Sequence, residues 1–490
     1  MNTDNLQKFW KVPVILLLLS IMFIPARADE LSIDHDSEDN LDSVLFIPLV
    51  VSSSSRGNPD ADVYFISPSG NDSNSGTSEA AAWATFIRAW QDMLPGDTLI
   101  LIDGVYNQSL DPNIGGQPGN PITIKAQHDG KAIIDGQGVR DPIILWRYKG
   151  ASYLIIEGIV AMNGNTLSGN GNVIRIGSDH NIFRRVSAYD ADTDANSVVI
   201  RIPGDYNLVE DCVAYGTGRK MIMTSGEHNT IRRCFSDWQS WDGRERHECW
   251  PWGDGIDIYN GSFNIIENSI SYSRNPTQSI IVRAQGFDEK AEGNKILGSM
   301  AILSGMKEDG IPMVWGDTRP QPSDDDCVRD FGDPGQRSGF FVWESGAPVK
   351  DNLWQDIFAW GNAGLGISWV TGVADPGTGN NRIIRATAFN NGLDNPDHWG
   401  GIHTDAILGD LQKFDSIDDS FIENIYNGSG TTMNGEGARL THRYVDGELT
   451  NEPLWPWPME SRIQAELGIS VTDLMTNIIF GTSDLAEIYP

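Results

Sequence analysis

His180-Asn-Ile-Phe-Arg-Arg-Val-Ser-Ala-Tyr189 is one copy of a short repeat that decides the fold: an asparagine precedes alternating apolar and polar residues. Tyr206-Asn-Leu-Val-Glu-Asp-Cys-Val-Ala-Tyr215 repeats it one unit later. The repeat asparagines stand at positions 181, 207, 229, 264, 294, 352 and 381. Their spacing is 22 to 35 residues, with one gap of 58 that fits two units. A period of this length is typical of solenoids.

Each unit contains short alternations of strand length, broken by Gly, Asn or Asp, and has no sustained 3.6-residue period. A unit this short cannot bury its own apolar face, so successive units must stack strand on strand. The pattern therefore predicts an all-β fold, a parallel β-helix. The alternative is an ordinary β-sandwich with chance internal similarity.

The start of the repeat region resembles a known family. Val63-Tyr-Phe-Ile-Ser-Pro-Ser-Gly70, Pro95-Gly-Asp-Thr-Leu-Ile-Leu-Ile-Asp-Gly-Val-Tyr106 and Ala132-Ile-Ile-Asp-Gly136 are similar to the opening of the pectate-lyase-like (pectin lyase fold) superfamily. The resemblance implies a right-handed β-helix with a short N-terminal capping helix. The sequence agrees, because Ala80 to Met93 is the best helical window and Pro95 ends it.

The N-terminus has the features of an export signal. Lys8 and Lys11 precede an apolar run from Val12 to Phe23, and Ala26-Arg-Ala28 fits a cleavage site. We expect residues 1–28 to be a signal peptide and the protein to be secreted, extracellular or on the cell surface, with no membrane contact after cleavage. An uncleaved N-terminal anchor is the alternative. Residues 29–61 form an acidic, flexible leader.

The remaining chain divides into two parts. Residues 62–450 are predicted to form the β-helix, with insertions near 238–256, 303–340 and 391–412, and residues 451–490 a C-terminal cap over the last coil. The sequence has 35 Lys and Arg against 67 Asp and Glu, a net charge of -32. A field of that sign repels phosphate backbones, so nucleic acid is not expected as a partner. We expect a monomer.

Cys212 and Cys234 each follow a repeat asparagine by five residues. In stacked coils they should be neighbours one strand spacing apart. In an exported protein they could form a disulfide, or they could be small side chains in the core.

A second strand precedes each repeat asparagine. If its aliphatic residues point inward, one exposed column is formed by Arg175, Arg201, Met221 or Met223, Asp257 and Arg283. Guanidinium groups bind carboxylates bidentately and so suit a uronic-acid polymer. The alternative is that these arginines pair with neighbouring carboxylates such as Asp257.

The segment from Asp237 to Tyr259 stretches one repeat and is rich in aromatic and acidic residues. Sugar rings could stack on its tryptophans, which are Trp238, Trp241, Trp250 and Trp252. Calcium binding or acid/base chemistry could use its carboxylates, which are Asp242, Glu248, Asp254 and Asp257. The alternative is a structural loop packed by its aromatic residues.

Gly253-Asp-Gly-Ile-Asp257 resembles two active-site patterns and departs from both. Pectate lyases with a capped β-helix have Asp-Gly-x-x-x-Lys, where the lysine is the base, but Tyr259 stands at that place here. The polygalacturonase pattern is matched only in its second half. Neither mechanism can be transferred intact. Lys220 could serve as a base, although a solvated lysine is the simpler interpretation.

These features predict a polysaccharide lyase that cleaves an acidic, uronic-acid polysaccharide by β-elimination. The expected catalytic residues are Arg283, Asp254, Asp257, Tyr259 and Glu248. The expected substrate-binding residues are Arg175, Arg201, Lys220, Trp241, Trp250 and Trp252, and calcium would be held by Asp242, Asp254 and Asp257. A glycoside hydrolase with paired carboxylates and a non-catalytic glycan-binding or cell-surface protein are the alternatives.

Overall fold

The computed structural model describes residues 61–165, 171–193, 196–240, 253–273, 277–286, 289–304, 338–362, 364–371, 379–389, 391, 407–408, 414–418, 421–425, 431–433 and 435–481. The predicted signal peptide, almost all of the leader, and most of each predicted insertion lie outside these residues. Within the described part, no helix is long and apolar enough to span a membrane.

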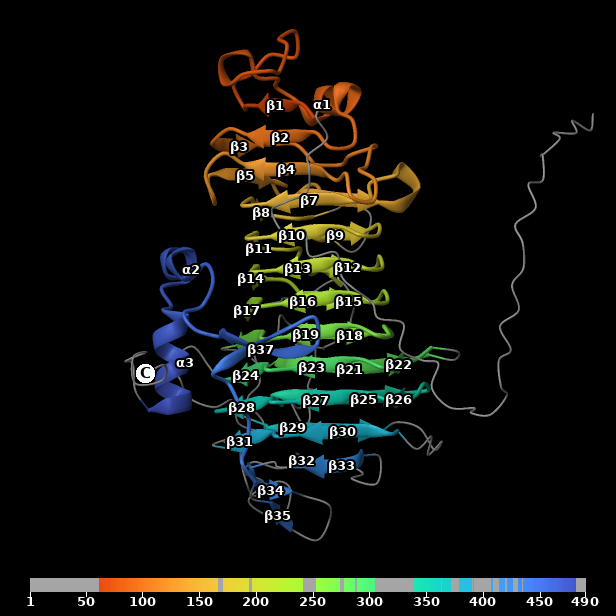
Figure 1. Ribbon diagram of the computed structural model, residues 1–490, viewed down its shortest axis with the longest axis vertical. Coiled ribbons are helices and arrows are strands. Elements are labelled where there is room, and N and C mark those ends of the chain that lie inside the picture. The colour runs from red at the N-terminus through yellow and green to blue at the C-terminus, as the bar shows by residue number, and fades with distance from the viewer. Residues whose placement is uncertain are drawn as a thin grey trace, which may run out of the picture. The chain divides into compact units, whose positions relative to one another are not determined.

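Three stacks of parallel strands wind around one axis (Figure 1). Sheet A consists of β1 (Val63–Ile66), β2 (Thr98–Leu101), β4 (Ile122–Ala126), β7 (Leu154–Glu157), β10 (Ile182–Arg184), β13 (Leu208–Glu210), β16 (Thr230–Arg232), β19 (Ile265–Glu267), β23 (Lys295–Leu297), β27 (Leu353–Gln355), β30 (Asn381–Ile384) and β33 (Phe414–Asp418). Sheet B consists of β3 (Gly104–Tyr106), β5 (Ala132–Asp135), β8 (Val160–Met162), β11 (Ser187–Tyr189), β14 (Val213–Thr217), β17 (Phe235–Ser240), β20 (Ile270–Ser273), β24 (Met300–Ile302), β28 (Phe358–Trp360), β31 (Thr387–Phe389), β34 (Phe421–Ile425) and the antiparallel β35 (Thr431–Met433).

Sheet C consists of β6 (Ile143–Trp146), β9 (Ile174–Gly177), β12 (Val198–Ile202), β15 (Lys220–Thr224), β18 (Gly253–Tyr259), β21 (Thr277–Gln285), β25 (Phe340–Ser345), β29 (Ile367–Thr371) and β32 (Ile407–Leu408). A short pair, β22 (Ala291–Glu292) and β26 (Val349–Lys350), extends two coils. The predicted right-handed parallel β-helix is confirmed.

The repeat asparagines explain why the units are alike. Asn181 donates from its backbone N–H and its side-chain amide to Oδ1 of Asn207, at 2.9 and 3.1 Å. Asn207 makes the same two bonds to Asn229, and the series continues to Asn381. These asparagines are buried, so each satisfies polar groups that the core would otherwise leave unpaired. A continuous ladder inside the core sets the register of one coil on the next.

The N-terminal helix is shorter than the sequence window predicted. A 3-10 turn spans Glu79–Ala81, and α1 runs only from Phe86 to Asp92. Thr85 caps α1 by accepting a hydrogen bond from the Arg88 N–H. Between the two, Trp83 bridges to Ile66 of β1 and is fully buried. The demand for this core contact interrupts the helical window.

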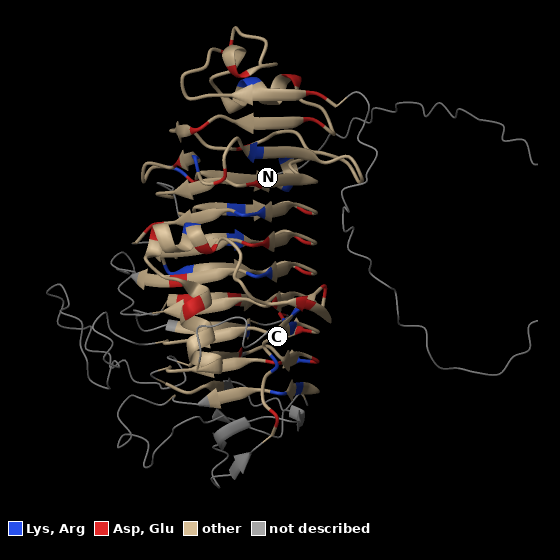
Figure 2. Ribbon diagram, turned by 60° about the vertical axis from the view of Figure 1, so that its left-hand side comes forward, with Lys and Arg blue, Asp and Glu red and all other residues tan. Residues whose placement is uncertain are grey.

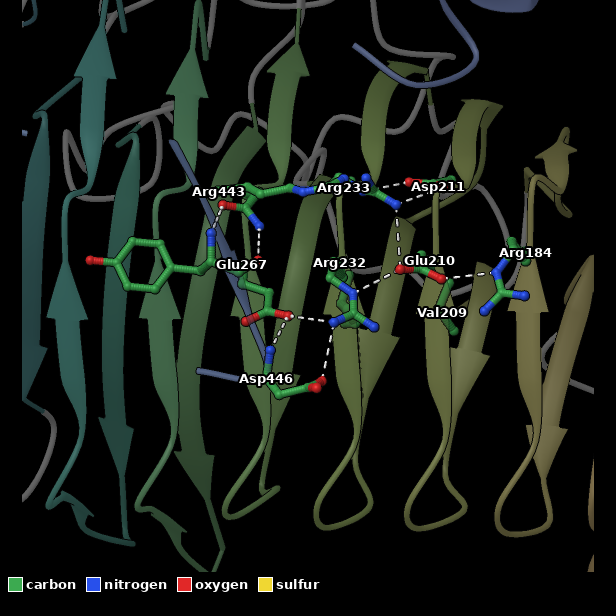
Figure 3. Close-up of polar contacts among 12 residues, drawn as sticks. Arg184, Val209, Glu210, Asp211, Arg232, Arg233, Glu267, Arg443 and Asp446 are labelled. Carbon is green, nitrogen blue, oxygen red and sulfur yellow. Dashed lines mark hydrogen bonds and ion pairs between the residues drawn. The ribbon is translucent and has the colours of Figure 1, made fainter. Parts of the chain in front are cut away.

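An alternating ladder of charges follows the outer face of sheet A (Figure 3). Glu210 accepts from Arg184 and pairs with Arg232, both at 2.9 Å, and Arg232 reaches Glu267 at 3.3 Å. Asp446, far away in the sequence, joins Arg232 at 3.1 Å. Because signs alternate coil by coil in this ladder, like charges are not stacked there, and its arginines, Arg184 and Arg232, are already paired.

The C-terminal segment lies along the flank of the coils. Its hairpin of β36 (His442–Val445) and β37 (Glu448–Pro453) and its helices α2 (Glu460–Leu467) and α3 (Val471–Phe480) are beside sheets A and B in both views (Figure 1, Figure 2). Arg462 donates to the Arg185 carbonyl at 2.9 Å. One apolar cluster joins Val213, Phe235, Ile270 and Met300 of sheet B to Trp455, Ile463 and Met475.

The described residues 451–481 therefore lie against the flank of the coils, and the prediction that residues 451–490 cover the last coil stays a prediction. The outer face of sheet B is apolar at these positions, and an apolar face of that extent requires a cover. The C-terminal segment supplies it. Sheet C, in contrast, keeps charged residues on its outer face.

Cys212 and Cys234 are free, buried thiols, so the predicted disulfide is corrected in favour of the core alternative. The sulfur of Cys212 lies 3.6 Å from the Phe183 carbonyl, and that of Cys234 lies 3.4 Å from the Val209 carbonyl. Burial raises the pKa of the Cys234 thiol. In-register strands hold the two side chains parallel, each with its own carbonyl acceptor.

Candidate functional site on the outer face of sheet C

Backbone pairing in sheet C defines which residues form a column. Arg175, Arg201, Met223 and Asp257 are successive partners on β9, β12, β15 and β18. The predicted column is thus present up to Asp257, with Met223 rather than the core residue Met221 as its member. Arg283 does not continue it, because Asp257 pairs with Ile281 and Arg283 pairs with Tyr259.

The side chain of Arg283 nevertheless reaches back to the acidic pair. Its Nε donates to Oδ1 of Asp257 at 3.0 Å, and its Nη2 contacts Asp254 and lies 2.9 Å from Oδ2 of Asp257. Lys220 meets the same carboxylates, with Nζ 2.7 Å from Asp257 and 3.1 Å from Asp254. Two cations and two anions from three neighbouring strands form one group, here called the charged quartet: Lys220, Asp254, Asp257 and Arg283.

The charged quartet is nearly removed from water. Lys220 is 4% exposed, Asp254 3%, Asp257 0% and Arg283 5%. The interpretation of Lys220 as a solvated lysine was therefore wrong. Burial of ions is costly unless they are paired, and here the formal charges sum to zero.

The pKa values of the quartet reflect burial and mutual attraction. Burial lowers the pKa of Lys220, and the neighbouring Arg283 adds to this effect, so that the pKa lies below its ordinary value despite the two carboxylates. For Asp254, burial acts upward, but Arg283 and Lys220 outweigh it and the pKa is lowered. For Arg283, burial acts downward and the two carboxylates outweigh it, which raises the pKa. Lys220 is thus the member whose charge is least favoured.

Two aromatic rings border the quartet. The Lys220 ammonium lies 4.8 Å from the centre of the Tyr259 ring, and the Arg283 guanidinium lies 5.9 Å from the Trp343 ring. The Tyr259 hydroxyl donates to Gln285 at 2.9 Å. Burial raises the pKa of Tyr259, so the phenol keeps its proton at neutral pH. Sequence reasoning found Tyr259 but missed Trp343, because the 58-residue gap hid the strand that carries it.

The other predicted site residues divide into two groups. Asp242, Glu248, Trp241, Trp250 and Trp252 lie outside the described residues, so their predicted roles stay predictions. Trp238 is described and is not available to a sugar: it is fully buried, and its indole N–H donates to the Gly218 carbonyl at 2.7 Å. A Cβ on Gly253 would lie 2.0 Å from this ring, so only glycine fits there.

The described residues do not form a calcium site by themselves. No three of their His, Cys, Asp and Glu side chains converge as metal ligands would. Asp254 and Asp257 are occupied by Lys220 and Arg283, and a cation would have to displace one of these partners. The prediction of calcium therefore depends on Asp242, outside the described residues.

Arg175 and Arg201 differ from the arginines of sheet A. Figure 2 shows charges of both signs along the coils, yet within the described part of the chain neither of these two guanidinium groups has a hydrogen bond or an ion pair. Both are partly exposed, and the Nε of each is buried without a partner. The side chain of Arg175 lies over Trp146, 4.9 Å from the ring centre.

Comparisons with known proteins agree with this architecture. A family model described as chondroitinase B matches residues 82–237, which is 156 of the 490 residues. A curated relative, the uncharacterized protein YwoF of Bacillus subtilis (strain 168), is 32% identical over 78 residues, a match that spans only 16% of the length of each protein.

Solved structures are similar at low identity. Pectate lyase Pel9A is 17% identical with a TM-score of 0.41, covering 72% of this chain and 78% of that one. A rhamnogalacturonan lyase is 16% identical with a TM-score of 0.43, covering 76% and 89%. The GH136 lacto-N-biosidase from Eubacterium ramulus is 12% identical with a TM-score of 0.36, covering 66% and 68%. The chain is a right-handed parallel β-helix protein whose N-terminal and central coils are similar to chondroitinase B.

Proposed function

We propose that this protein is a polysaccharide lyase that cleaves an acidic, uronic-acid polysaccharide by β-elimination. The observation that carries the proposal is the charged quartet, in which a lysine of lowered pKa and an arginine share the same two carboxylates on the outer face of sheet C. The similarity to chondroitinase B over residues 82–237 supports a lyase-like protein.

The chemistry assigns one task to each group. Arg283 binds the carboxylate of the uronic acid and neutralises it, which makes the neighbouring C5 proton more acidic. Lys220 takes this proton in its deprotonated form, which burial and the neighbouring Arg283 make more accessible than in an ordinary lysine. The C5–H electron pair forms the double bond between C4 and C5, and the bond from C4 to the glycosidic oxygen breaks. Tyr259, which holds its proton at neutral pH, donates it to the leaving oxygen.

Asp254 and Asp257 are positioning residues in this mechanism. They orient Lys220 and Arg283 and neutralise their charges before substrate arrives. When the substrate carboxylate engages Arg283, the guanidinium exchanges part of its contact with Asp254 and Asp257 for the substrate.

Hydrolysis by paired carboxylates is less well supported. A glycosidase acid must hold a proton, which requires a raised pKa, whereas the pKa of Asp254 is lowered and Asp257 is bound by two cations. A hydrolase would have to draw its acid from residues outside the described part, such as Glu248. Secretion, a monomeric state and calcium binding through Asp242 belong to the proposal and follow from the sequence.

The first test is activity. Purified protein is incubated with a panel of uronic-acid polymers, with and without calcium, and the ultraviolet absorbance of the unsaturated product is followed. Release of this product supports the lyase. Reducing ends without the chromophore would select the hydrolase, and bound but uncut polymer the non-catalytic alternative. No product from any polymer by the folded protein would refute the proposal.

The second test concerns Lys220. Replacing the base should lower kcat by a factor of about 10² to 10⁴ in K220A, while K131A, which removes an exposed lysine between β4 and β5, should leave kcat unchanged. The wild-type rate should rise with pH through the pKa of Lys220, which lies below that of an ordinary lysine. Retention of full activity and of the same pH profile in K220A would assign Lys220 a structural role.

A further inference from the structure

Arg175 and Arg201 are direct neighbours on adjacent parallel strands. Their backbones are in register, which places the two Cα atoms about 4.8 Å apart. Both side chains leave the same face of sheet C, so two positive charges stand side by side. In the described part of the chain the arginines at equivalent places in sheet A are paired, as Arg184 is with Glu210 and Arg232 with Glu267.

The surroundings do not neutralise this pair. Asp141 is the carboxylate that acts on both guanidinium groups, but it makes no ion pair with either of them and accepts the backbone N–H of Asn172 at 2.9 Å. Burial raises the pKa of Asp141 to about 6, so the carboxylate is still ionised at pH 7 and one negative charge faces two guanidinium groups. Burial also lowers the pKa of both arginines.

The orientation of Arg175 is already set before any ligand binds. The Trp146 ring lies 4.9 Å from its guanidinium carbon and holds the group by a cation–π contact. The Nε–H groups of Arg175 and Arg201 are buried and have no hydrogen-bond acceptor among the described residues. A buried donor without an acceptor costs free energy. An anion bound between the two partly exposed side chains would offset the repulsion of the two like charges.

We infer that Arg175 and Arg201 form an anion subsite that binds a carboxylate or sulfate group of the polysaccharide away from the bond that is cut. The inference rests on the proposed function for the identity of the polymer, but the binding itself does not require catalysis. Bidentate guanidinium groups are suited to both anions.

The subsite also gives the polymer a direction. Arg201 is on β12, Lys220 on the next strand β15, and Arg283 two strands further on β21. Parallel strands are about 4.8 Å apart, close to the length of one sugar unit, so the polymer runs along the axis of the coils. The substrate class is then a chain with an acidic group on a unit a few places from the reacting uronic acid.

Binding is tested with the inactive K220A variant as the background, so that no substrate is consumed. Affinity is measured by calorimetry for three oligosaccharide probes: an unsulfated oligouronate, a sulfated oligosaccharide without uronic acid, and a neutral oligosaccharide of equal length. R175Q and R201Q should each weaken binding of an acidic probe about tenfold and reduce its salt dependence. Which acidic probe responds identifies carboxylate or sulfate as the ligand.

Two further variants sharpen the result. R147Q removes an exposed arginine that is paired with Asp179 and Asp205 on an outer turn, and it should bind the probes as the background does. Among the described residues, Asp141 is the carboxylate that acts on both arginines. D141N removes its charge, keeps an acceptor for Asn172, and should strengthen acidic binding.

Failure of the inference is separable from failure of the proposed function. Unchanged affinity in R175Q and R201Q, or equal affinity for acidic and neutral probes, would overturn the subsite even if the wild-type protein is a lyase. Loss of acidic binding in R175Q and R201Q with no lyase activity in the wild type would uphold the subsite and remove the mechanism. Circular dichroism confirms that each variant is folded.

Discussion

Removing two opposite charges from the quartet together should cost less stability than the sum of the two separate removals. K220M leaves two carboxylates against Arg283, and D257N leaves two cations against Asp254. At an effective dielectric of about 20, unit charges about 3 Å apart attract by about 5 kcal/mol, and loss of one partner from a buried pair costs about 3–5 kcal/mol. The double variant K220M/D257N keeps the Arg283–Asp254 pair and is neutral again.

The three variants form a thermodynamic cycle. We expect each single change to lower the free energy of unfolding by about 3–5 kcal/mol, and the double change to cost about 3 kcal/mol less than the sum of the two. The buried, low-dielectric position of all four side chains is the reason.

The assay is urea unfolding followed by tryptophan fluorescence and, in parallel, by far-ultraviolet circular dichroism. Coincident transitions by the two probes justify the two-state treatment. K131M serves as the control for an exposed lysine and should change stability by less than about 0.5 kcal/mol. Single variants that cost under about 1 kcal/mol, or a double variant whose cost equals the sum, would refute the description of the quartet as one coupled group.

Three other outcomes are expected. Burial raises the pKa of Asp141 from 3.8 to about 6, so the protonated carboxyl stabilises the fold below pH 3.8 and this contribution is lost as the pH rises to 6. The free energy of unfolding of D141N should therefore exceed that of the wild type by up to about 3 kcal/mol at pH 7 and by nothing near pH 3.5. Thermal unfolding measured across pH would contradict this if D141N were less stable than the wild type at pH 7. In a chain whose other two cysteines are replaced by serine, a thiol reagent should label Cys212 and Cys234 only after unfolding, whereas a disulfide would block labelling in both states. Y444F removes the hydroxyl that donates to the buried Asp356 and should lower the free energy of unfolding by about 1–3 kcal/mol. Proteolysis of the C-terminal segment should be faster in this variant. Unchanged stability and unchanged cleavage would show that this contact does not hold the segment.

Much of the scaffold was predictable because its determinants are local. The repeat asparagines predicted the coil length, and they proved to be the ladder from Asn181 to Asn381. The equal offset from the repeat asparagines predicted Cys212 and Cys234 as neighbours on adjacent coils and left a disulfide or a core position open; both are buried free thiols. The family resemblance gave the correct handedness and N-terminal helix, although a tertiary contact of Trp83 shortened that helix.

The site was only partly predictable, since it depends on lateral register. Arg283 was assigned to the column of Asp257, but pairing places it beside Tyr259, and only the length of its side chain brings it back to Asp254 and Asp257. Lys220 was taken as solvated because nothing near it in sequence is acidic. Its partners lie 34 and 37 residues away, on the next coil.

By itself the sequence determined the repeat, the strand periodicity and the set of residues that can face outward, because these follow from alternation within single strands and from the demand that buried amides be paired. Only the tertiary structure decided which outward residues meet. In the folded protein, Lys220 and Arg283 share two carboxylates, and the C-terminal segment covers part of the outer face of sheet B. Arg175 and Arg201 have no ion pair among the described residues. Such contacts join different coils, and the gaps between coils vary, so no local pattern encodes them.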